Sequence, residues 1–312
     1  MLDDGPTLEV DLRGLSPDEW RARLDAIGDE HGYFLPIGAD HSALFIDAGP
    51  KLLVTFEEAS AIRRAPGARP RGFEMAAREG WSLLAFIADG PTWFRSDAMT
   101  WFVDRQVDDG FFEDFDSVLF HGSGMGGYAA GAYSVAAPGC RVLLHRPVAT
   151  LEPAVAGWDR RDLGARRLDF TTRYGFAPEM VDAALAAWVV HDPLHAPDAM
   201  HAALFRRPNV TLLRAPLAGA RLEQMLELMD ATPRLLSAAM DGTLDRAEWG
   251  RIWRGRREIV PYARLLLRRA EGAGREDLSR RICRYGLQTS DAALYAPRAR
   301  ELGLAVEPQP AA

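Results

Sequence analysis

A glycine-rich turn carries the residues whose types and spacing could do chemistry. A turn that holds a nucleophile between a strand and a helix is so crowded that glycine is needed two residues before and after the reactive residue. One frame of the sequence meets this demand, and it consists of Gly122, Ser123, Gly124, Met125 and Gly126. The central residue is Gly124, whereas a frame centred on Ser123 would place larger side chains at the crowded positions. The turn is therefore predicted to keep the shape of a nucleophile site and to lack the reacting atom.

Short apolar runs alternate with helical patterns on both sides of this turn. Uniformly apolar runs are typical of parallel strands that are buried on both faces. Their alternation with helices predicts an α/β fold with a doubly wound, mostly parallel sheet. A helix over 125–137 is expected to leave the turn. The predicted buried strands cover residues 83–88, 118–120, 142–144, 188–190 and 210–213.

The N-terminal part is expected to contain one helix and three short strands. Ser16, Pro17 and Glu19 have the types and spacing of a helix cap, which predicts a helix over 16–31. Turn residues separate the second strand from the third, so these two strands are expected to pair as a hairpin. The three strands are predicted at 33–37, 43–46 and 52–56.

The last part of the chain has helical patterns only, which predicts a sheet domain over 1–221 and an all-helical C-terminal extension over 222–312. Arginines outnumber acidic residues between Arg246 and Arg284, although the whole chain has a net charge of −7. Such helices either form a solvated face or dock a protein partner. Nucleic acid is not expected, because aromatic residues do not interleave with the charge. The predicted helices cover 222–239, 246–257, 262–272, 276–286 and 292–302.

The composition is that of a globular chain without a membrane span. Apolar residues make up 48% of the 312 residues, but no apolar run reaches the roughly 18 residues that a span needs. The N-terminus is acidic and lacks the pattern of a secretory signal, so we expect a cytoplasmic protein. Two cysteines indicate no disulfide framework. Cys140 is expected to be buried, whereas arginines near Cys283 predict a lowered pKa for that thiol.

The element order from 52 to 221 resembles the α/β-hydrolase fold, and Gly-Ser-Gly-Met-Gly-Gly-Tyr at 122–128 is similar to the nucleophile elbow of lipases and esterases. The resemblance implies a triad in the order nucleophile, acid, histidine. Asp192 stands at the position of the acid, but Ala220 stands where the histidine is expected, and the last histidine is His201. The loop implied for the oxyanion hole contains Glu57 and Glu58, whose charges would oppose an oxyanion.

These departures predict a non-hydrolytic binding or accessory protein rather than an enzyme. Ligands of open α/β sheets bind at the carboxyl ends of the strands. In topology the chain resembles degenerate hydrolase-like proteins that accompany bacterial surface-glycan synthesis, which implies a small-molecule or glycan-type ligand. The candidate ligand-binding residues are Glu57, Asp89, Trp93, His121, Gly122, Ser123, Gly124, Met125 and Asp192.

Two other functions are open. An active serine hydrolase or esterase would attack with Ser123, take His121 or His191 as its base and use Asp192 as the acid. A thiol-dependent oxidoreductase would work through Cys283. Chains of this bacterial group are often labelled phosphoadenosine phosphosulfate reductase, but the phosphate-loop and Cys-Gly-x-His motifs of such reductases are absent.

A histidine-rich run over 191–201 has residue types that suit zinc. Pro193 and Pro197 prevent one helix from aligning positions four apart, and a short helix is expected to begin near Asp198. We interpret the run as loop residues and predict neither a metal nor a cofactor. The turn at 122–126 also lacks the Gly-x-Gly-x-x-Gly spacing of a dinucleotide-binding loop.

Overall fold

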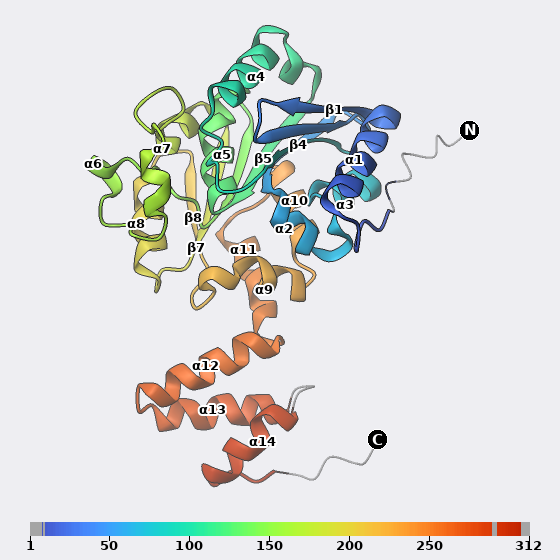
Figure 1. Cartoon of the computed structure of the whole chain (residues 1–312). Coiled ribbons are helices and arrows are strands. Elements are labelled where there is room, and N and C mark those ends of the chain that lie inside the picture. The colour runs from blue at the N-terminus through green and yellow to red at the C-terminus, as the bar shows by residue number, and fades with distance from the viewer. Residues whose placement is uncertain (1–7, 9, 289–291, 307–312) are drawn as a thin grey trace.

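A mixed sheet of eight strands forms the centre of the computed structural model, which describes residue 8 and residues 10–288 and 292–306 (Figure 1). The strand order is β1-β2-β4-β3-β5-β6-β7-β8. β2 is antiparallel to β1 and to β4, and all other neighbours are parallel. The predicted mostly parallel α/β sheet is thus confirmed. The strands are β1 (Gly32–Ile37), β2 (His41–Ile46), β3 (Lys51–Glu58), β4 (Ser82–Ala88), β5 (Ser117–Ser123), β6 (Arg141–His145), β7 (Ala186–His191) and β8 (Val210–Arg214).

The predicted pairing of the second and third strands is wrong. β2 forms its hairpin with β1, and β4 lies between β2 and β3. The turn after β2 instead carries the chain past the start of β4, where the Ser82 hydroxyl accepts from the N–H groups of Ala48 and Gly49 and donates to the carbonyl of Gly49. Because β4 is buried on both faces, it takes an inner position that the local turn pattern could not indicate.

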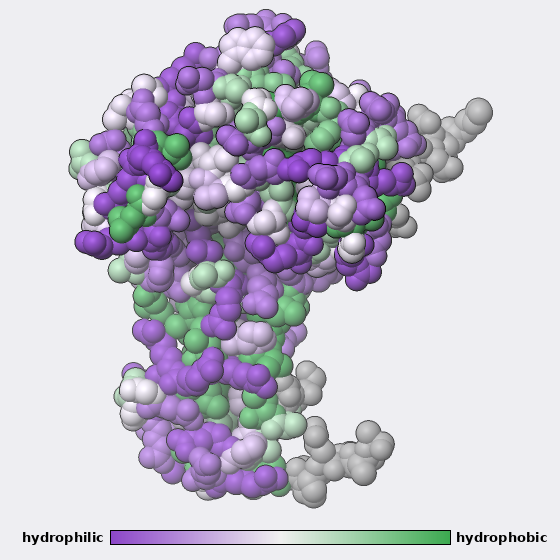
Figure 2. Space-filling model, in the orientation of Figure 1, coloured by the Kyte–Doolittle hydropathy of each residue, from purple (hydrophilic) through white to green (hydrophobic). Residues whose placement is uncertain are grey.

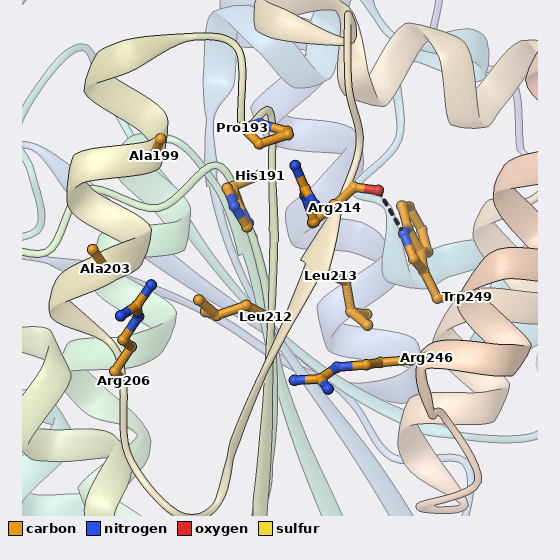
Figure 3. A pocket seen from close by; sticks show the side chains of 10 residues that line it. All are labelled: His191, Pro193, Ala199, Ala203, Arg206, Leu212, Leu213, Arg214, Arg246 and Trp249. Atoms are coloured by element: carbon orange, nitrogen blue, oxygen red, sulfur yellow. Dashed lines mark hydrogen bonds between the residues drawn. The ribbon is translucent and has the colours of Figure 1, made fainter.

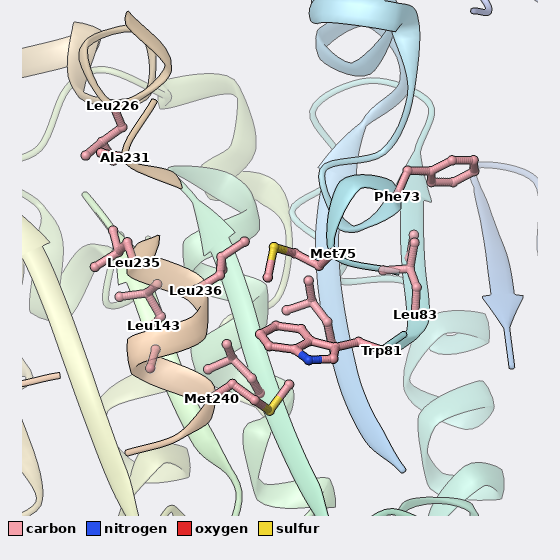
Figure 4. Close-up of a cluster of buried hydrophobic side chains, with 14 of the residues drawn as sticks. Phe73, Met75, Trp81, Leu83, Leu143, Leu226, Ala231, Leu235, Leu236 and Met240 are labelled. Atoms are coloured by element: carbon pink, nitrogen blue, oxygen red, sulfur yellow. The ribbon is translucent and has the colours of Figure 1, made fainter. Parts of the chain in front are cut away.

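Helices cover both faces of the sheet, and each face has its own apolar cluster. Successive residues of a strand point to opposite faces, so Leu119 of β5 belongs to one cluster and its neighbours Val118 and Phe120 to the other. Figure 4 shows the first cluster, where Leu236 and Met240 lie on the same face of the sheet as residues of the segment before β4. The helices of that face are α1 (Pro17–His31), α2 (Ala59–Arg64), α3 (Gly72–Glu79), α9 (Leu222–Leu228), α10 (Thr232–Met240) and α11 (Arg246–Arg254).

The opposite face is covered by the helices that connect β4 to β8. Its cluster contains buried aromatic side chains, including Phe56, whose ring stacks on those of Phe120 and Tyr133. The helix predicted over 125–137 ends at Tyr133 and continues as a single 3₁₀ turn. The helices between β4 and β8 are α4 (Asp97–Asp108), α5 (Met125–Tyr133), α6 (Pro153–Ala156), α7 (Ala177–Met180) and α8 (Ala196–Leu204).

The C-terminal helices divide into a group on the sheet and a group beyond it. The helix predicted over 222–239 is two helices, α9 and α10, because Asp230 adopts a φ of 48° that a continuous helix does not allow. α9 to α11 pack in the cluster of the first sheet face. The remaining three have a separate apolar cluster and extend away from the sheet (Figure 1), with apolar patches on the surface where the two groups join (Figure 2). They are α12 (Val260–Gly272), α13 (Glu276–Leu287) and α14 (Ala292–Glu301).

Both thiols lie in the interior. Cys140 is 4% exposed, as predicted, and burial raises its pKa to about 12. Cys283 was predicted to have a lowered pKa, and this is wrong. Its side chain is fully buried among α13 and α14, so burial and then Glu271 raise its pKa, against a smaller opposite effect of Arg298. The neighbouring arginines of α13, Arg280, Arg281 and Arg284, are exposed to solvent.

We expect iodoacetamide to modify neither cysteine in the folded protein, because only an accessible thiolate reacts. Mass spectrometry after a brief exposure should show unmodified native protein, and both of the two thiols modified in concentrated guanidinium chloride. Rapid native modification of Cys283 would contradict the packing of α13 against α14.

Candidate functional site

The turn between β5 and α5 has an unusual backbone at its centre. Gly124 has φ 56° and ψ −116°, a combination that residues other than glycine rarely adopt. A Cβ atom at Gly124 would meet no other atom within 4 Å. In contrast, a Cβ on Gly122 would lie 2.1 Å from the carbonyl oxygen of Gly126, and one on Gly126 would lie 2.0 Å from that of Phe56. The turn is crowded on both sides of Gly124 and open at Gly124 itself.

A cavity of about 290 Å³ lies beside this turn. It collects residues from β3, α2, β5, α5 and α9, with Arg71 from the segment before α3. Five of the predicted ligand-binding residues line it, and Gly124 forms the turn next to it. The lining residues are Thr55, Phe56, Glu57, Glu58, Ala61, Arg71, His121, Gly122, Ser123, Met125, Gly126 and Glu223.

The hydroxyl of Ser123 donates a hydrogen bond to a carboxylate. Its Oγ lies 2.5 Å from Oε1 of Glu223, which also lies 3.6 Å from Nδ1 of His145. The guanidinium of Arg146 is 3.7 Å from the other carboxylate oxygen. Burial would raise the pKa of Glu223, but the contacts with His145, Ser123 and Arg146 outweigh it and bring this pKa to about 2. Glu223 is therefore a stable carboxylate that occupies the hydrogen-bonding position beside Ser123.

The sequence reasoning missed Glu223. It lies in the first turn of α9, three residues after Ala220, where a histidine was expected. The only indication in the sequence was that an acidic residue stands close to the position at which the histidine was expected. His145 was also missed, because it directly follows the apolar run of β6, and only the sheet register brings it beside Ser123.

His121 lines the cavity as a buried histidine. Its side chain is 1% exposed, and burial, then His145 and Arg71, hold its pKa well below the usual value. The ring is therefore neutral and carries one proton. Because Nδ1 lies 2.9 Å from the carbonyl oxygen of Leu143, that nitrogen must be the donor. The other nitrogen, Nε2, is an acceptor with no hydrogen-bond partner in the part of the chain that the structure describes.

Glu57 is the second-last residue of β3 and lies beside Arg71 at the cavity. Its carboxylate accepts from the backbone N–H of Arg71 at 3.0 Å and lies 3.6 Å from the guanidinium. Burial raises the pKa of Glu57, and the contacts with Arg71 only partly oppose this effect. The cavity lining thus contains the cation Arg71, the three carboxyl groups of Glu57, Glu58 and Glu223, and the buried imidazole of His121.

The other predicted site residues lie elsewhere. Asp89 pairs with Arg21 at the end of β4. Trp93 is buried, with its ring packed edge-on against Tyr128 and its backbone N–H directed to the sulfur of Met125. Asp192 follows β7, as expected for the acid, but its carboxylate accepts the backbone N–H groups of Leu194 at 2.9 Å and Gly219 at 3.0 Å. Among described residues, no imidazole forms a hydrogen bond or ion pair with the carboxylate of Asp192 or a hydrogen bond with Ser123.

The histidine-rich run forms ion pairs instead of a metal cluster. Asp198 is buried between Arg146 and Arg161, and His195 Nδ1 lies 3.1 Å from it. His201 contacts Asp159, a partner 42 residues earlier in the chain, at 2.9 Å. Within the described ranges, no group of three or more histidine, cysteine or acidic residues is placed to hold a metal ion. No helix among them is long and apolar enough to cross a membrane.

Comparisons with known proteins give only distant structural similarity. No family model matches the chain, and no curated protein does. The capsule O-acetyltransferase of Neisseria meningitidis serogroup A is 11% identical, with a TM-score of 0.43 over 65% of this chain and 94% of its own. The carboxylesterase EstE1 from a metagenomic library is 12% identical, with a TM-score of 0.44 over 77% and 98%. MPT51 of Mycobacterium tuberculosis is 14% identical, with a TM-score of 0.42 over 67% and 98%.

The class of protein follows from the chain's own geometry. A mostly parallel eight-stranded sheet with an antiparallel second strand, helices on both faces and a glycine-lined turn after β5 define an α/β-hydrolase-like fold. The C-terminal helices α12 to α14 extend the fold beyond the sheet.

Replacing Gly126 with alanine should destabilise the protein strongly. Its Cβ would lie 2.0 Å from a carbonyl oxygen of β3, so backbone must shift. We expect a loss of about 2–4 kcal/mol in the free energy of unfolding, measured with urea. Gly250→Ala is the control, since nothing lies within 4 Å of its Cβ and it sits inside α11. That variant should be unchanged or more stable by up to about 1 kcal/mol. Equal losses in the free energy of unfolding for Gly126→Ala and Gly250→Ala would contradict the close contact between Gly126 and β3.

Glu223 should make stability depend on pH. Its folded pKa of about 2 is below the ordinary value of 4.5, so its contribution is present above that value and disappears as the pH falls toward 2. Glu223→Gln should therefore lower the free energy of unfolding at neutral pH, and its difference from wild type should shrink in acid. Exposed Glu113→Gln is the control and should differ little throughout. If the difference in the free energy of unfolding between Glu223→Gln and wild type stayed constant with pH, the conclusion that Glu223 is ionised in the folded protein would be wrong.

Proposed function

We propose that the chain is a non-hydrolytic binding protein that uses the cavity beside the β5–α5 turn as its ligand site. The observation that carries this proposal is the backbone of Gly124. Its dihedral angles and the open space around it suit a projecting nucleophile, but glycine provides no side chain. Acyl transfer through a covalent intermediate needs such an atom. What the turn retains is a cavity and the first N–H groups of α5, which have no partner within the helix.

Ser123 is the alternative nucleophile, and its surroundings weigh against it. Its hydroxyl donates to Glu223, whose pKa of about 2 makes a weak base at neutral pH. His121 directs its proton-bearing nitrogen to the carbonyl of Leu143. The other proposed base, His191, lines a different cavity beside β8. An active hydrolase that uses Ser123 would have to rearrange these contacts.

The cavity favours a small ligand with several hydrogen-bond donors. Acceptors dominate its polar lining, because the carboxyl groups of Glu57, Glu58 and Glu223 line a volume of about 290 Å³, while the cation Arg71 already faces Glu57. This volume is at the lower end for ligand sites. A sugar-sized polyol supplies donors of the required kind, which agrees with the expected glycan-type ligand. The protruding helices α12 to α14 would then be available to a protein partner.

A fluorophosphonate probe tests the absence of hydrolytic chemistry directly. Wild type should show no labelling above that of Ser123→Ala, under conditions in which an added serine hydrolase is labelled fully. Ser60→Ala removes a hydroxyl near the cavity but outside the turn, and serves as the matched control. Stoichiometric labelling of wild type that is lost in Ser123→Ala and kept in Ser60→Ala would overturn the proposal.

A further inference from the structure

A second cavity, of about 630 Å³, lies beside strand β8, between α8 and α11 (Figure 3). It shares no lining residue with the cavity at the β5–α5 turn. We call it the β8 groove. His191 and Arg206 lie on its α8 side, and Arg246 and Trp249 on its α11 side. Leu212 and Arg214 come from β8 itself.

The charge of the β8 groove is of one sign. Arg206, Arg214 and Arg246 line it, and no aspartate or glutamate does. All three are exposed, and none of their guanidinium groups forms an ion pair within the described residues. The nearest acid in sequence, Asp245, accepts the N–H of Glu248 at the start of α11. Three unpaired guanidinium groups around one concavity favour an anionic ligand.

The open edge of β8 is too short for an added peptide strand. The carbonyl of Asn209 accepts from the N–H of Ala187, and the N–H of Ala215 donates to the carbonyl of His191. The backbone groups of alternate residues from 209 to 215 therefore point toward β7, and those of the residues between them point toward the open edge. Of these, Val210 already donates to the carbonyl of Arg207, and the carbonyl of Arg214 accepts the indole N–H of Trp249 at 2.9 Å. Leu212 is left as the one residue with both backbone groups open.

The groove also has an apolar lining. Leu212, Leu213 and Trp249 form part of its wall, together with alanines of α8. Its volume is within the range of small-molecule sites, which combine apolar walls with a few charged or polar groups. His191 is 7% exposed, and burial lowers its pKa, so the ring adds a neutral polar contact rather than further charge.

The geometry points to the β8 groove as a binding site for a small amphipathic organic anion. A sulfonate, phosphate or carboxylate group would contact guanidinium groups among those of Arg206, Arg214 and Arg246, which line different sides of the groove. The apolar body would lie against Leu212 and Trp249. This site is independent of the proposed ligand at the β5–α5 turn, and either can exist without the other.

Anilinonaphthalene sulfonate is a suitable probe, because it joins an aromatic body to one fixed negative charge and fluoresces when bound. Titration of wild type should show a saturable site. The double variant Arg214→Gln/Arg246→Gln should weaken this site by about tenfold or more, because charge-assisted contacts are lost. Arg23→Gln/Arg160→Gln removes the same charge from exposed positions outside the groove and should change the dissociation constant less than about twofold.

An uncharged analogue, phenylnaphthylamine, separates charge recognition from general apolar binding. It should bind the groove more weakly than the sulfonate, and Arg214→Gln/Arg246→Gln should not affect it. The thermal transitions of all variants should match that of wild type, since the replaced side chains are exposed. The proposal fails if the groove variant binds the sulfonate like wild type. It also fails if the control variant loses as much affinity, or if both probes respond alike.

Discussion

The contact between β3 and the start of α5 is the constraint on which the rest of the site depends. Gly126 lies so close to the carbonyl of Phe56 that no side chain fits between them, and Gly122 is similarly close to Gly126. This approach lets α5 begin directly after β5 and fixes the left-handed backbone of Gly124. It also brings the end of β3, with Glu57, against the turn, so that both segments border one cavity. The shape is maintained by backbone packing and does not require a reactive side chain.

Charge pairing then determines what this shape can do. Glu223 reaches Ser123 from α9 and is held as a carboxylate by His145 and Arg146. Arg146 also forms an ion pair with Asp198, so the ion pairs extend from the turn to α8. A buried carboxylate that must stay charged contributes to folding stability at neutral pH, whereas a general base must accept a proton near that pH. The arrangement beside Ser123 favours a fixed structure over proton transfer.

Local sequence patterns predicted most of the elements but not the contacts between distant segments. The uniformly apolar runs correctly predicted the strands β4 to β8, and the cap at Ser16 correctly predicted the helix α1. The hairpin was wrong because strand order depends on β4, which is more than thirty residues beyond β2. Glu223 was missed because its partner Ser123 is 100 residues away. The arginines of the β8 groove come from the segment after α8, from β8 and from α11, so only the fold reveals that no acid accompanies them.

The most direct test of the account is the steady-state hydrolysis of p-nitrophenyl acetate by wild type and by Ser123→Ala. If Gly124 leaves the turn without a nucleophile and Glu223 holds the Ser123 hydroxyl, both proteins should give the same slow, non-saturable rate. Saturable turnover by wild type that disappears in Ser123→Ala would contradict the account, because it would show that Ser123 is activated in the folded protein.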